Sequence, residues 1–598
     1  LDYRGVMAGV NDSAEKKISG VHFGSTFDLA YTHYQDPAYI SVIRLFETVD
    51  PIFGHAELPE TEQTLGTENA FSDNIGIMVL RSRKEGRTPE EQIQAMLRYG
   101  SHGFAHGHFD RTELLSVMRY GRSFYNPESI WWGYAHFMYK FYVQNSNTKN
   151  MVVVDGKMQI PADAQRVLFY SGTSFQAGAV RTSSRWGFPP FGGMIYDNGD
   201  SLAQRCERNA SDLSCYDAAE YGEITEVTEK ICQTRVMVVL DDCIVLFDCM
   251  EGETEHLYES LMEIKGFREL VPVNPKGSIR ATHHTGKKSD NPKSDTQFIT
   301  DCCWYQAEGE TVARFETRFG NGADNRGNLG EYNEPGSLNM DIYTAWPLKT
   351  QQMHGLEAED LGVRVPYNMR VLTDGECRME YSANAWLLGA RELDIAVEPE
   401  CRTLTLEIFN KPIYSEQNYP YAGPQGLFLG DSYVELEDGS KVAILGLPVR
   451  RVNIDEGCGI GRDYQNGRVL IEGIEYLDAI PISPIDHDKK AYITVELSGL
   501  RAIRFHGIVG ADNFPGPEEE RRRHYAVGQT AREGRFVTVV EPYEGTGKIA
   551  SVEGISAEKV KIQYTDGSWQ EITAETIKAV PYVTVNTDRI GQRQHEHS

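Results

Sequence analysis

The densest group of ionisable side chains in this sequence lies within residues 102–122. In it, His106, His108 and Asp110 are spaced two residues apart. If the chain is extended from 106 to 117, its alternation places these three side chains on one face. They could then transfer protons or bind a metal ion, because histidine titrates near neutral pH and its ring nitrogens ligate metals. The same string could also be a polar strand edge without chemistry.

Residues 129–142 (SIWWGYAHFMYKFY) form an aromatic stretch close by. Trp131 and Trp132 could stack against sugar rings, which present an apolar face and outward hydroxyl groups. Tyr134 and Tyr142 could exchange protons through their phenols. An aromatic stripe in a protein core would have the same composition, so the stretch alone leaves both interpretations open.

Four arginines near these stretches could hold carboxylate or sulfate groups through paired hydrogen bonds, namely Arg111, Arg122, Arg181 and Arg185. Each could also be an ordinary surface arginine. The chain as a whole is acidic, with a formal net charge of −28. This charge argues against a nucleic-acid partner, since such binding depends on neutralising phosphates. A local basic cleft could still hold an anionic polysaccharide.

The elements that must position these residues are mostly strands. The chain has 598 residues, 56 glycines and 31 tyrosines, and it lacks long helical blocks, so we expect a mainly β fold of about two to four domains. No run of eighteen apolar residues occurs, so we expect no membrane span. No pair of cysteines has the CxxC spacing of a zinc site, and no P-loop or dinucleotide-binding motif is present.

The pattern along the chain divides it into four parts. Residues 16–46 predict two helices broken near Asp36 and Pro37, because proline disfavours helix in the residue before it. Residues 90–99 predict a third short helix. Strand runs such as 151–154, 235–247 and 312–315 follow. We therefore expect a helical part at 1–95, a large antiparallel β-sandwich at 96–438, an inserted small jelly roll at 439–515 and a closing β segment at 516–598.

Several stretches resemble the heparinase II/III-like polysaccharide lyases. The stretch at 103–128 is similar to the strand pair that opens the β-sandwich of that family, with its H-x-H-x-D string. The stretch at 146–156 (SNTKNMVVVDG) resembles the family's S-x-x-H-N-T-V-x-V-D-G strand, and 235–252 and 535–542 resemble later strands. The resemblance implies that residues 1–60 are the last helices of an (α/α) toroid. It also implies a secreted or periplasmic protein.

The resemblance assigns roles to single residues. His106 would lie beside the scissile uronic acid, as proton acceptor or as stabiliser of developing charge. His108 would correspond to a zinc ligand of the family. Here Asn126 stands in place of an aspartate and Lys149 in place of a histidine. Because an ammonium cannot ligate zinc, we expect no cofactor and predict that the charge of Lys149 replaces the ion and tethers the same strand.

The activity that the resemblance implies is β-elimination at a uronic-acid-containing polysaccharide. In the family, a tyrosine and an Asn or His from the toroid complete the site, and these residues would lie upstream of Leu1. A partner fragment carrying the toroid could supply them, or Tyr134 and Tyr142 could substitute; a homo-oligomer is the other assembly left open. Two other functions remain open: a non-catalytic carbohydrate-binding subunit, and a glycoside hydrolase with Asp110 and Glu113 as its paired carboxylates.

A second resemblance concerns residues 462–512. The runs at 473–476, 491–499 and 505–512 look like the NPCBM-type jelly roll, a module associated with carbohydrate-active enzymes. This likeness and the short strands after 439, with a turn every eight to twelve residues, are the basis for the inserted jelly roll expected at 439–515. A role in bracing the larger sandwich is an alternative to sugar binding.

Overall fold

The structure is a computed structural model of the 598-residue chain. It describes the following residues, with gaps between them: 2–7, 9–11, 16–17, 20–44, 58–60, 65–101, 107–124, 142–188, 226–289, 291, 294, 296, 299–319, 336–357, 367–381, 391–410, 427–455, 459–462, 468–471, 474–486, 489–511, 522–576, 580–589 and 592–597.

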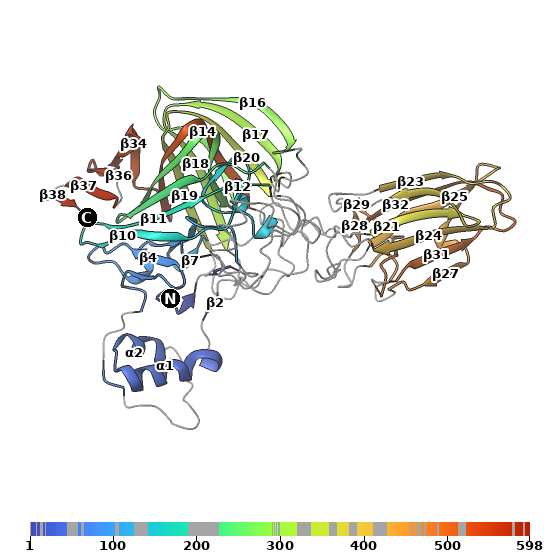
Figure 1. The fold of residues 1–598 in the computed structure, drawn as a ribbon, viewed down its shortest axis with the longest axis horizontal. Coiled ribbons are helices and arrows are strands. Elements are labelled where there is room, and N and C mark those ends of the chain that lie inside the picture. The colour runs from blue at the N-terminus through green and yellow to red at the C-terminus, as the bar shows by residue number, and fades with distance from the viewer. Residues whose placement is uncertain are drawn as a thin grey trace.

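Two helices follow the short paired strands β1 (Val6–Met7) and β2 (Lys16–Lys17), and Figure 1 shows them beside the β structure. Helix α1 spans Gly20–Tyr34 and α2 spans Ala38–Ile43. Between them, the side chain of Asp36 accepts a hydrogen bond from the amide of Ala38 (2.9 Å), and Pro37 directly precedes α2. The predicted pair of helices with a break at this point is confirmed. Their membership of a toroid stays a prediction.

The third predicted helix, at 90–99, is wrong. Only a single 3₁₀ turn, η1 (Pro89–Glu91), precedes strand β5 (Gln94–Arg98). All five residues of β5 are buried, and the strand pairs with a neighbour on each side. Burial on both faces hides the alternation that would identify a strand in the sequence. The sheet has the order β3-β4-β5-β6-β7, with β3 at Ala70–Ser72, β4 at Ile77–Arg81, β6 at Leu114–Arg119 and β7 at Arg122–Ser123.

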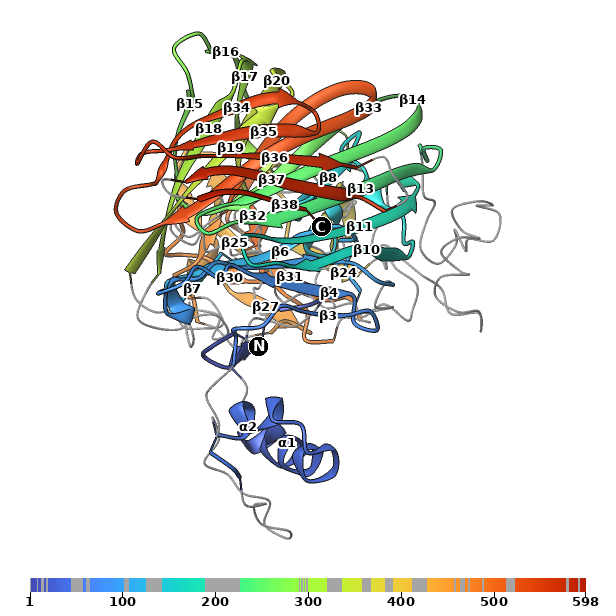
Figure 2. The same ribbon diagram turned by 90° about the vertical axis from the view of Figure 1, so that its left-hand side faces the viewer.

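A twelve-stranded antiparallel sheet forms the largest unit. Its main path runs β10-β11-β13-β14-β33-β19-β18-β15, while β8 pairs with β14, and β20, β17 and β16 continue from β33 (Figure 2). The strands are β8 (Val152–Val154), β10 (Ala164–Ser171), β11 (Gln176–Ser184), β13 (Ile231–Val239), β14 (Ile244–Ile264), β15 (Phe267–Pro272), β16 (Ser278–Lys287), β17 (Ile299–Glu308), β18 (Thr311–Phe319), β19 (Gly336–Trp346), β20 (Lys349–Glu357) and β33 (Arg523–Tyr543).

Two long strands, β14 and β33, carry this sheet around a corner. The first half of β14 pairs with β13 and its second half with β8, and the pairing of β14 with β33 shifts register between Glu251 and His256. Close packing fixes the corner: a Cβ on Gly252 would lie 2.8 Å from the hydroxyl of Tyr258, and one on Gly534 would lie 2.6 Å from the Tyr258 ring. Glycine at these two positions therefore lets the two long strands bend past one aromatic ring.

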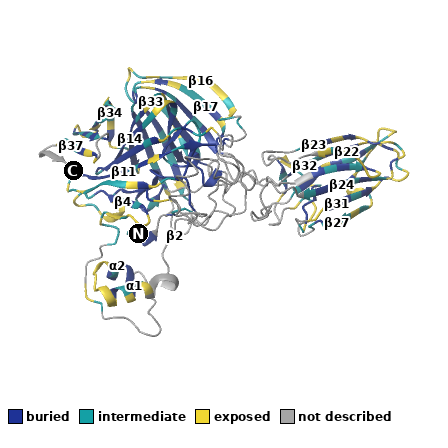
Figure 3. Ribbon diagram, in the orientation of Figure 1, coloured by how far each residue is buried: buried dark blue, intermediate teal, exposed yellow. Residues whose placement is uncertain are grey.

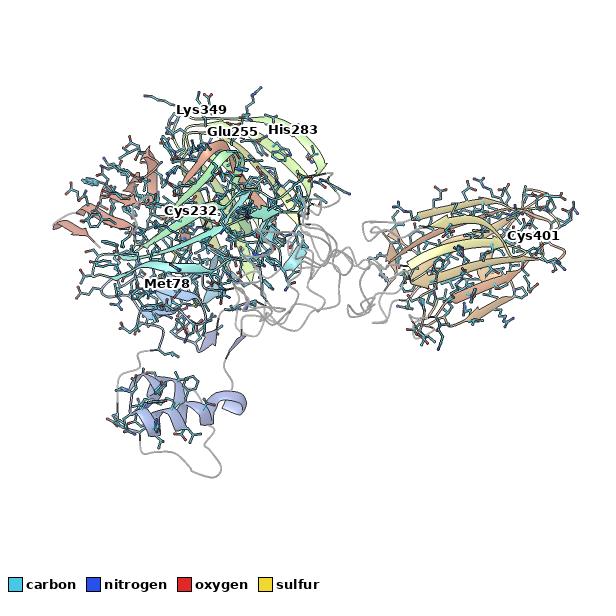
Figure 4. All side chains as sticks on the ribbon, in the orientation of Figure 1. Met78, Cys232, Glu255, His283, Lys349 and Cys401 are labelled. Atoms are coloured by element: carbon cyan, nitrogen blue, oxygen red, sulfur yellow. The ribbon has the colours of Figure 1, made fainter. Side chains whose placement is uncertain are left out.

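The core lies on both faces of this sheet, as Figure 3 shows by its buried strands. On one face, the β3–β7 sheet packs closely against the twelve-stranded sheet. A Cβ on Gly178 of β11 would lie 2.1 Å from the sulfur of Met78 of β4. Met78 is one of the side chains labelled in Figure 4. The other face is covered by a five-stranded C-terminal sheet of strands β34 (Ile549–Ser556), β35 (Lys559–Tyr564), β36 (Trp569–Glu575), β37 (Tyr582–Arg589) and β38 (Gln592–His597). We call the β3–β7 sheet, the twelve-stranded sheet and this C-terminal sheet the main body.

A second pair of sheets, which we call the smaller sandwich, draws on residues 367–511. One sheet has the order β22-β21-β24-β31-β27, and the other has the order β23-β32-β25-β26 with β30 beside β25. The strands are β21 (Tyr367–Thr373), β22 (Glu376–Tyr381), β23 (Arg391–Ala396), β24 (Thr403–Asn410), β25 (Leu427–Leu436), β26 (Lys441–Ala443), β27 (Val449–Val452), β30 (Ile480–Pro481), β31 (Ala491–Glu496) and β32 (Ala502–Ala511).

Strand pairing in the smaller sandwich begins upstream of the jelly-roll boundary expected at residue 439. Strand β24 pairs with β31 and β23 pairs with β32, so strands from both sides of that position share one apolar core. The repeated turns after 439 were visible in the sequence, whereas the pairing partners before it were not. The division of the chain into domains stays a prediction.

The predicted mainly β fold with a large antiparallel sandwich is confirmed. Two short pairs complete the described strands: β9 (Met158–Gln159) with β12 (Trp186–Gly187), and β28 (Leu470–Ile471) with β29 (Ile474–Glu475). Within the described ranges, neither helix is long and apolar enough to cross a bilayer.

Candidate functional site

The segment 146–156 is attached to its neighbours through nearly every polar side chain it has. The 3₁₀ turn η4 (Ser146–Thr148) opens it, after Asn145, whose side chain accepts a hydrogen bond from the amide of Asn147. The hydroxyl of Ser146 donates to the carbonyl of Phe109 (2.6 Å) and accepts from the amide of Gln159 (2.9 Å). One serine thus joins the segment to the 107–112 loop and to β9.

Asn150 holds the segment between β6 and β14. Its side-chain amide donates to the carbonyl of Leu114 (3.1 Å), and its side-chain oxygen accepts from the amide of Glu263 (2.8 Å). Its backbone carbonyl accepts from the amide of Leu114 (3.0 Å). An asparagine can do this because its side chain offers both a donor and an acceptor.

Lys149 is buried, with its side chain turned back along its own segment. Its ammonium donates to the carbonyl of Val143 (2.7 Å), and the residue is only 5% exposed. A buried charge of this kind is stabilised by hydrogen bonding to backbone oxygens. The contact is a tether of the kind predicted for Lys149, whereas the replacement of an ion stays a prediction because Asn126 lies outside the described residues.

The part of the chain that the structure describes contains no group of three or more His, Cys, Asp or Glu side chains that could hold a metal ion. His108 is described and buried. His108 therefore belongs to no such group among the described residues, and the expectation that the protein binds no cofactor stays a prediction.

The 107–112 loop differs from the extended strand predicted for 106–117. Strand β6 begins only at Leu114. Before it, the amide of Glu113 bonds to the carbonyl of Asp110 (3.0 Å), and Thr112 has a φ of +89°. A closed turn and a left-handed residue break the two-residue alternation. His108 and Asp110 lie before this strand, so the extended strand on which their shared face depended is not formed there.

Asp110 and Arg111 form a buried ion pair instead of facing solvent. A guanidinium nitrogen of Arg111 lies 2.8 Å from a carboxylate oxygen of Asp110, and another nitrogen donates to the carbonyl of His108 (3.2 Å). Arg98 approaches the other carboxylate oxygen at 3.9 Å. Burial lowers the pKa of Arg111 to about 10. The structure thus places Arg111, predicted to bind substrate, where it supports the loop.

The other described candidates are held by separate parts of the main body. Tyr142 is fully buried in the apolar core. Arg122 pairs with Glu544 in the turn after β33. Arg185 donates to the carbonyl of Thr228 (3.0 Å). These contacts do not bring Arg122 and Arg185 to Arg111. The remaining candidates, His106, Trp131, Trp132 and Tyr134, lie outside the described residues.

Sequence reasoning missed the ion pair beneath these segments. Both guanidinium arms of Arg235 on β13 bind the carboxylate of Asp248 on β14 (2.6 and 3.0 Å), and both side chains are 0% exposed. Arg235 also donates to the carbonyls of Thr112 (3.0 Å) and Asn150 (2.6 Å). Arg235 of β13 therefore joins the 107–112 loop to the 146–156 segment. The available signal was a charged residue inside each of two apolar runs.

A histidine between two carboxylates closes the far end of the segment. His256 lies 2.8 Å from Asp155 through Nδ1 and 3.0 Å from Glu229 through Nε2. Burial lowers the pKa of His256, but the hydrogen bonds that the ring donates to both carboxylates outweigh burial and raise this pKa above its ordinary value. Because both nitrogens face carboxylates, the doubly protonated imidazolium satisfies this site. Asp155 is thereby fixed at the corner of β14.

Among the comparisons with known proteins, the search of solved structures is the one that gives matches. No family model matches the sequence, and a search of curated proteins finds no match. The structure is similar to heparan sulfate lyase HepC from Pedobacter heparinus (7% identity, TM-score 0.36), with 99% of this chain and 51% of that chain covered. It is also similar to heparinase III (8% identity, TM-score 0.37), with 99% and 50% covered. The chain spans about half the length of these two proteins.

Proposed function

We propose that this chain is the β-rich part of a polysaccharide lyase that cleaves a uronic-acid-containing polysaccharide by β-elimination. The observation that carries the proposal is the direct bonding of two stretches that resemble the lyase family. Ser146 donates to the carbonyl of Phe109 (2.6 Å), the amide of Phe109 donates to the carbonyl of Gln144 (2.9 Å), and the Gln144 side chain donates to the carbonyl of Gly107 (3.0 Å). The stretches 103–128 and 146–156 are thus bonded to each other directly through Ser146 and Phe109, which supports the proposal.

The chemistry consists of two proton transfers and the stabilisation of one developing charge. A base removes the C5 proton next to the uronate carboxylate, the electron pair forms a C4–C5 double bond, and the C4–O4 bond breaks as an acid protonates O4. A positive or hydrogen-bonding group stabilises the intermediate carboxylate charge. We assign His106 to proton acceptance or charge stabilisation, and Tyr134 to a remaining transfer. Tyr142 is fully buried, so we assign it no transfer.

The proposed substrate is an anionic polysaccharide. Trp131 and Trp132 are proposed to stack on its rings, and Arg185 and Arg122 to meet its acidic groups. Arg111 is left out because its guanidinium is enclosed with Asp110. A toroid carried by a partner fragment is proposed to complete the site, in a secreted or periplasmic enzyme, with a homo-oligomer as the alternative assembly.

The test is ultraviolet absorbance during incubation with heparan sulfate, chondroitin, hyaluronan, alginate and ulvan. Elimination creates a conjugated double bond, so in the presence of the completing toroid fragment absorbance rises with at least one substrate and the rise is lost in His106→Ala. His283→Ala is the matched control, because His283 is an exposed histidine at the edge strand β16 (Figure 4). It is expected to keep full activity. Release of reducing ends without absorbance would indicate a hydrolase and contradict the proposal, as would binding without product.

A further inference from the structure

Six charged or titratable side chains form an enclosed network beside the 146–156 segment. Their side chains are at most 5% exposed. They come from strands β14, β20 and β33 and from the chain flanking β16 and β33: Glu259, Glu263, Lys288, Glu357, Arg522 and His524. Taking such charges out of water costs several kcal/mol per ion, and apolar residues could fill the same space. Because a buried ion network adds little net stability, its contacts with the neighbouring segment are the feature that needs an explanation.

The order of donors and acceptors in this network is fixed by its chemistry. The Lys288 ammonium lies 3.1 Å from a carboxylate oxygen of Glu259 and 2.9 Å from Nε2 of His524. An ammonium only donates, so Nε2 of His524 must accept. The proton of a neutral imidazole is then on Nδ1, which bonds to the carboxylate of Glu263. Burial, followed by the charge of Lys288, holds the pKa of His524 well below its ordinary value, which agrees with a neutral ring.

The network makes two contacts with the 146–156 segment. The backbone amide of Glu263 donates to the side chain of Asn150 (2.8 Å). The residue whose carboxylate accepts the hydrogen bond from His524 therefore also binds Asn150. Arg522 binds Glu357 (3.1 Å) and donates to the carbonyl of Thr148 (3.4 Å). The network therefore contacts the backbone carbonyl of Thr148 and the side chain of Asn150, the residues on either side of Lys149.

We propose that His524 and Lys288 are positioning residues that set the conformation of Thr148–Asn150 through Glu263, in service of the lyase reaction proposed above. The charged groups that face His524 are Glu263 and Glu259 of β14, Lys288 after β16, Arg522 at the start of β33 and Glu357 at the end of β20. Since the ring donates on one side and accepts on the other, only a residue that does both can replace it.

The test compares His524→Leu with His524→Gln in the full chain. Glutamine keeps a donor and an acceptor, whereas leucine fills the space and keeps neither. We expect amide exchange at 148–150 to become at least tenfold faster in the leucine variant and to stay near wild type in the glutamine variant. Nitrogen NMR of the wild-type His524 ring is expected to show the Nδ1–H tautomer. Equal exchange in all three proteins, or the Nε2–H tautomer, would overturn the proposal.

Lyase turnover is measured on the same proteins. The leucine variant should lose kcat with little change in KM, because the network does not touch substrate, and glutamine should rescue it. If the leucine variant does not fold, Lys288→Met is used instead. It removes the donor to Nε2 of His524, and the same acceleration of exchange at 148–150 is expected. If exchange at 148–150 changes in the leucine variant but the wild type shows no lyase turnover, the positioning role is retained and the lyase function is rejected. Turnover that is unchanged in both folded variants would reject the positioning role alone.

Discussion

The main body and the smaller sandwich are both antiparallel β structures, but their interiors differ in kind. Among the described residues of the smaller sandwich, Glu407 is the single buried charged side chain, and it pairs with Arg370 and Lys490. The main body buries many charged side chains, including the pairs Asp110 with Arg111 and Arg235 with Asp248. An apolar interior is thus sufficient for a sandwich in this chain, so the buried charges of the main body call for a local explanation.

That explanation lies in where the charges are. Arg235, Glu263 and Arg522 each bond to residues 148–150, and Asp110 lies in the loop to which Ser146 is bonded. Buried ion pairs add little net stability, but they hold backbone groups in defined positions. Part of the buried charge of the main body therefore gathers around the 146–156 segment, where we propose a functional constraint, whereas Asp242 and Asp341 pair with Arg119 and Arg314.

The largest effect is expected from Arg235→Met. The substitution leaves the carboxylate of Asp248 buried without its guanidinium and releases the carbonyls of Thr112 and Asn150. Breaking a buried ion pair from one side costs about 3–5 kcal/mol. Amide exchange resolved by peptide should therefore accelerate in β13 and β14 while β24 and β31 of the smaller sandwich remain unchanged.

The double substitution Arg235→Met with Asp248→Leu is the control. Since both charges are gone, it should recover much of the lost protection in β13 and β14. If the double variant is as unstable as the single one, the pair is needed for packing and the comparison of the two interiors loses its main example.

The next effect depends on pH and concerns Glu541 of β33. The residue is 1% exposed, and burial, together with the nearby carboxylates of Asp341 and Asp242, raises its pKa from 4.5 to about 7. Between these values the unfolded chain has lost a proton that the folded chain keeps. Stability is therefore complete below pH 4.5 and falls as the pH rises to about 7, by at most about 1.4 kcal/mol per pH unit for this group.

Glu541→Gln should flatten this loss. The amide oxygen can still accept from the backbone of Ile549, which lies 3.1 Å from the carboxylate, but the side chain no longer ionises. Urea unfolding at a series of pH values from 5 to about 8 measures the difference. The gap between variant and wild type should widen with pH, and a constant gap would contradict the assigned pKa.

The sequence predicted the parts of the fold that depend on neighbours along the chain. The break between α1 and α2 follows from Pro37, and strand β8 follows from a short apolar run. It failed at β5, whose two partner strands bury both of its faces, and at the 107–112 loop, where Thr112 adopts a left-handed conformation. Neither feature has a local signal in the residue types.

The candidate site shows the same limit. Ser146 and Asn150 could be singled out from a resemblance, but their partners could not be named. Asn150 meets Glu263, 113 residues away, and Arg235 meets Thr112, 123 residues away. Such contacts depend on how the long strands turn at the corner of the sheet, so residue types and spacing do not reveal them.

A smaller effect is expected at the His256 clamp, where the charges are partly exposed. The pKa of His256 is raised above 6.5, so its contribution is complete below that pH and is lost as the pH rises through the folded-state value. Burial raises the pKa of Glu229, but hydrogen bonds from Thr254 and His256 outweigh burial and lower it from 4.5 to about 2. The contribution of Glu229 is therefore complete above pH 4.5 and is lost as the pH falls toward 2.

His256→Gln should remove the loss of stability that occurs in the wild type as the pH rises through the folded-state pKa of His256. Amide exchange at Asp155 and Leu257, which are bonded to each other (2.8 Å), reports on the clamp directly. In the wild type, protection at these amides should decline above neutral pH beyond the intrinsic acceleration of exchange. A decline of the same size in the variant would show that the clamp does not depend on the imidazolium.

The smallest effect is expected in the smaller sandwich, at Arg504→Ala. Arg504 on β32 bonds to both carboxylate oxygens of Asp394 on β23, with the same two-pronged geometry as Arg235 and Asp248. The side chains are 49% and 42% exposed, so water can solvate either charge once the other is removed. Exchange in β23 and β32 should stay within error of the wild type. Protection lost on the scale seen for Arg235→Met would mean that pairing geometry, and not burial, separates the two interiors, and the functional interpretation of the buried charges would fail with it.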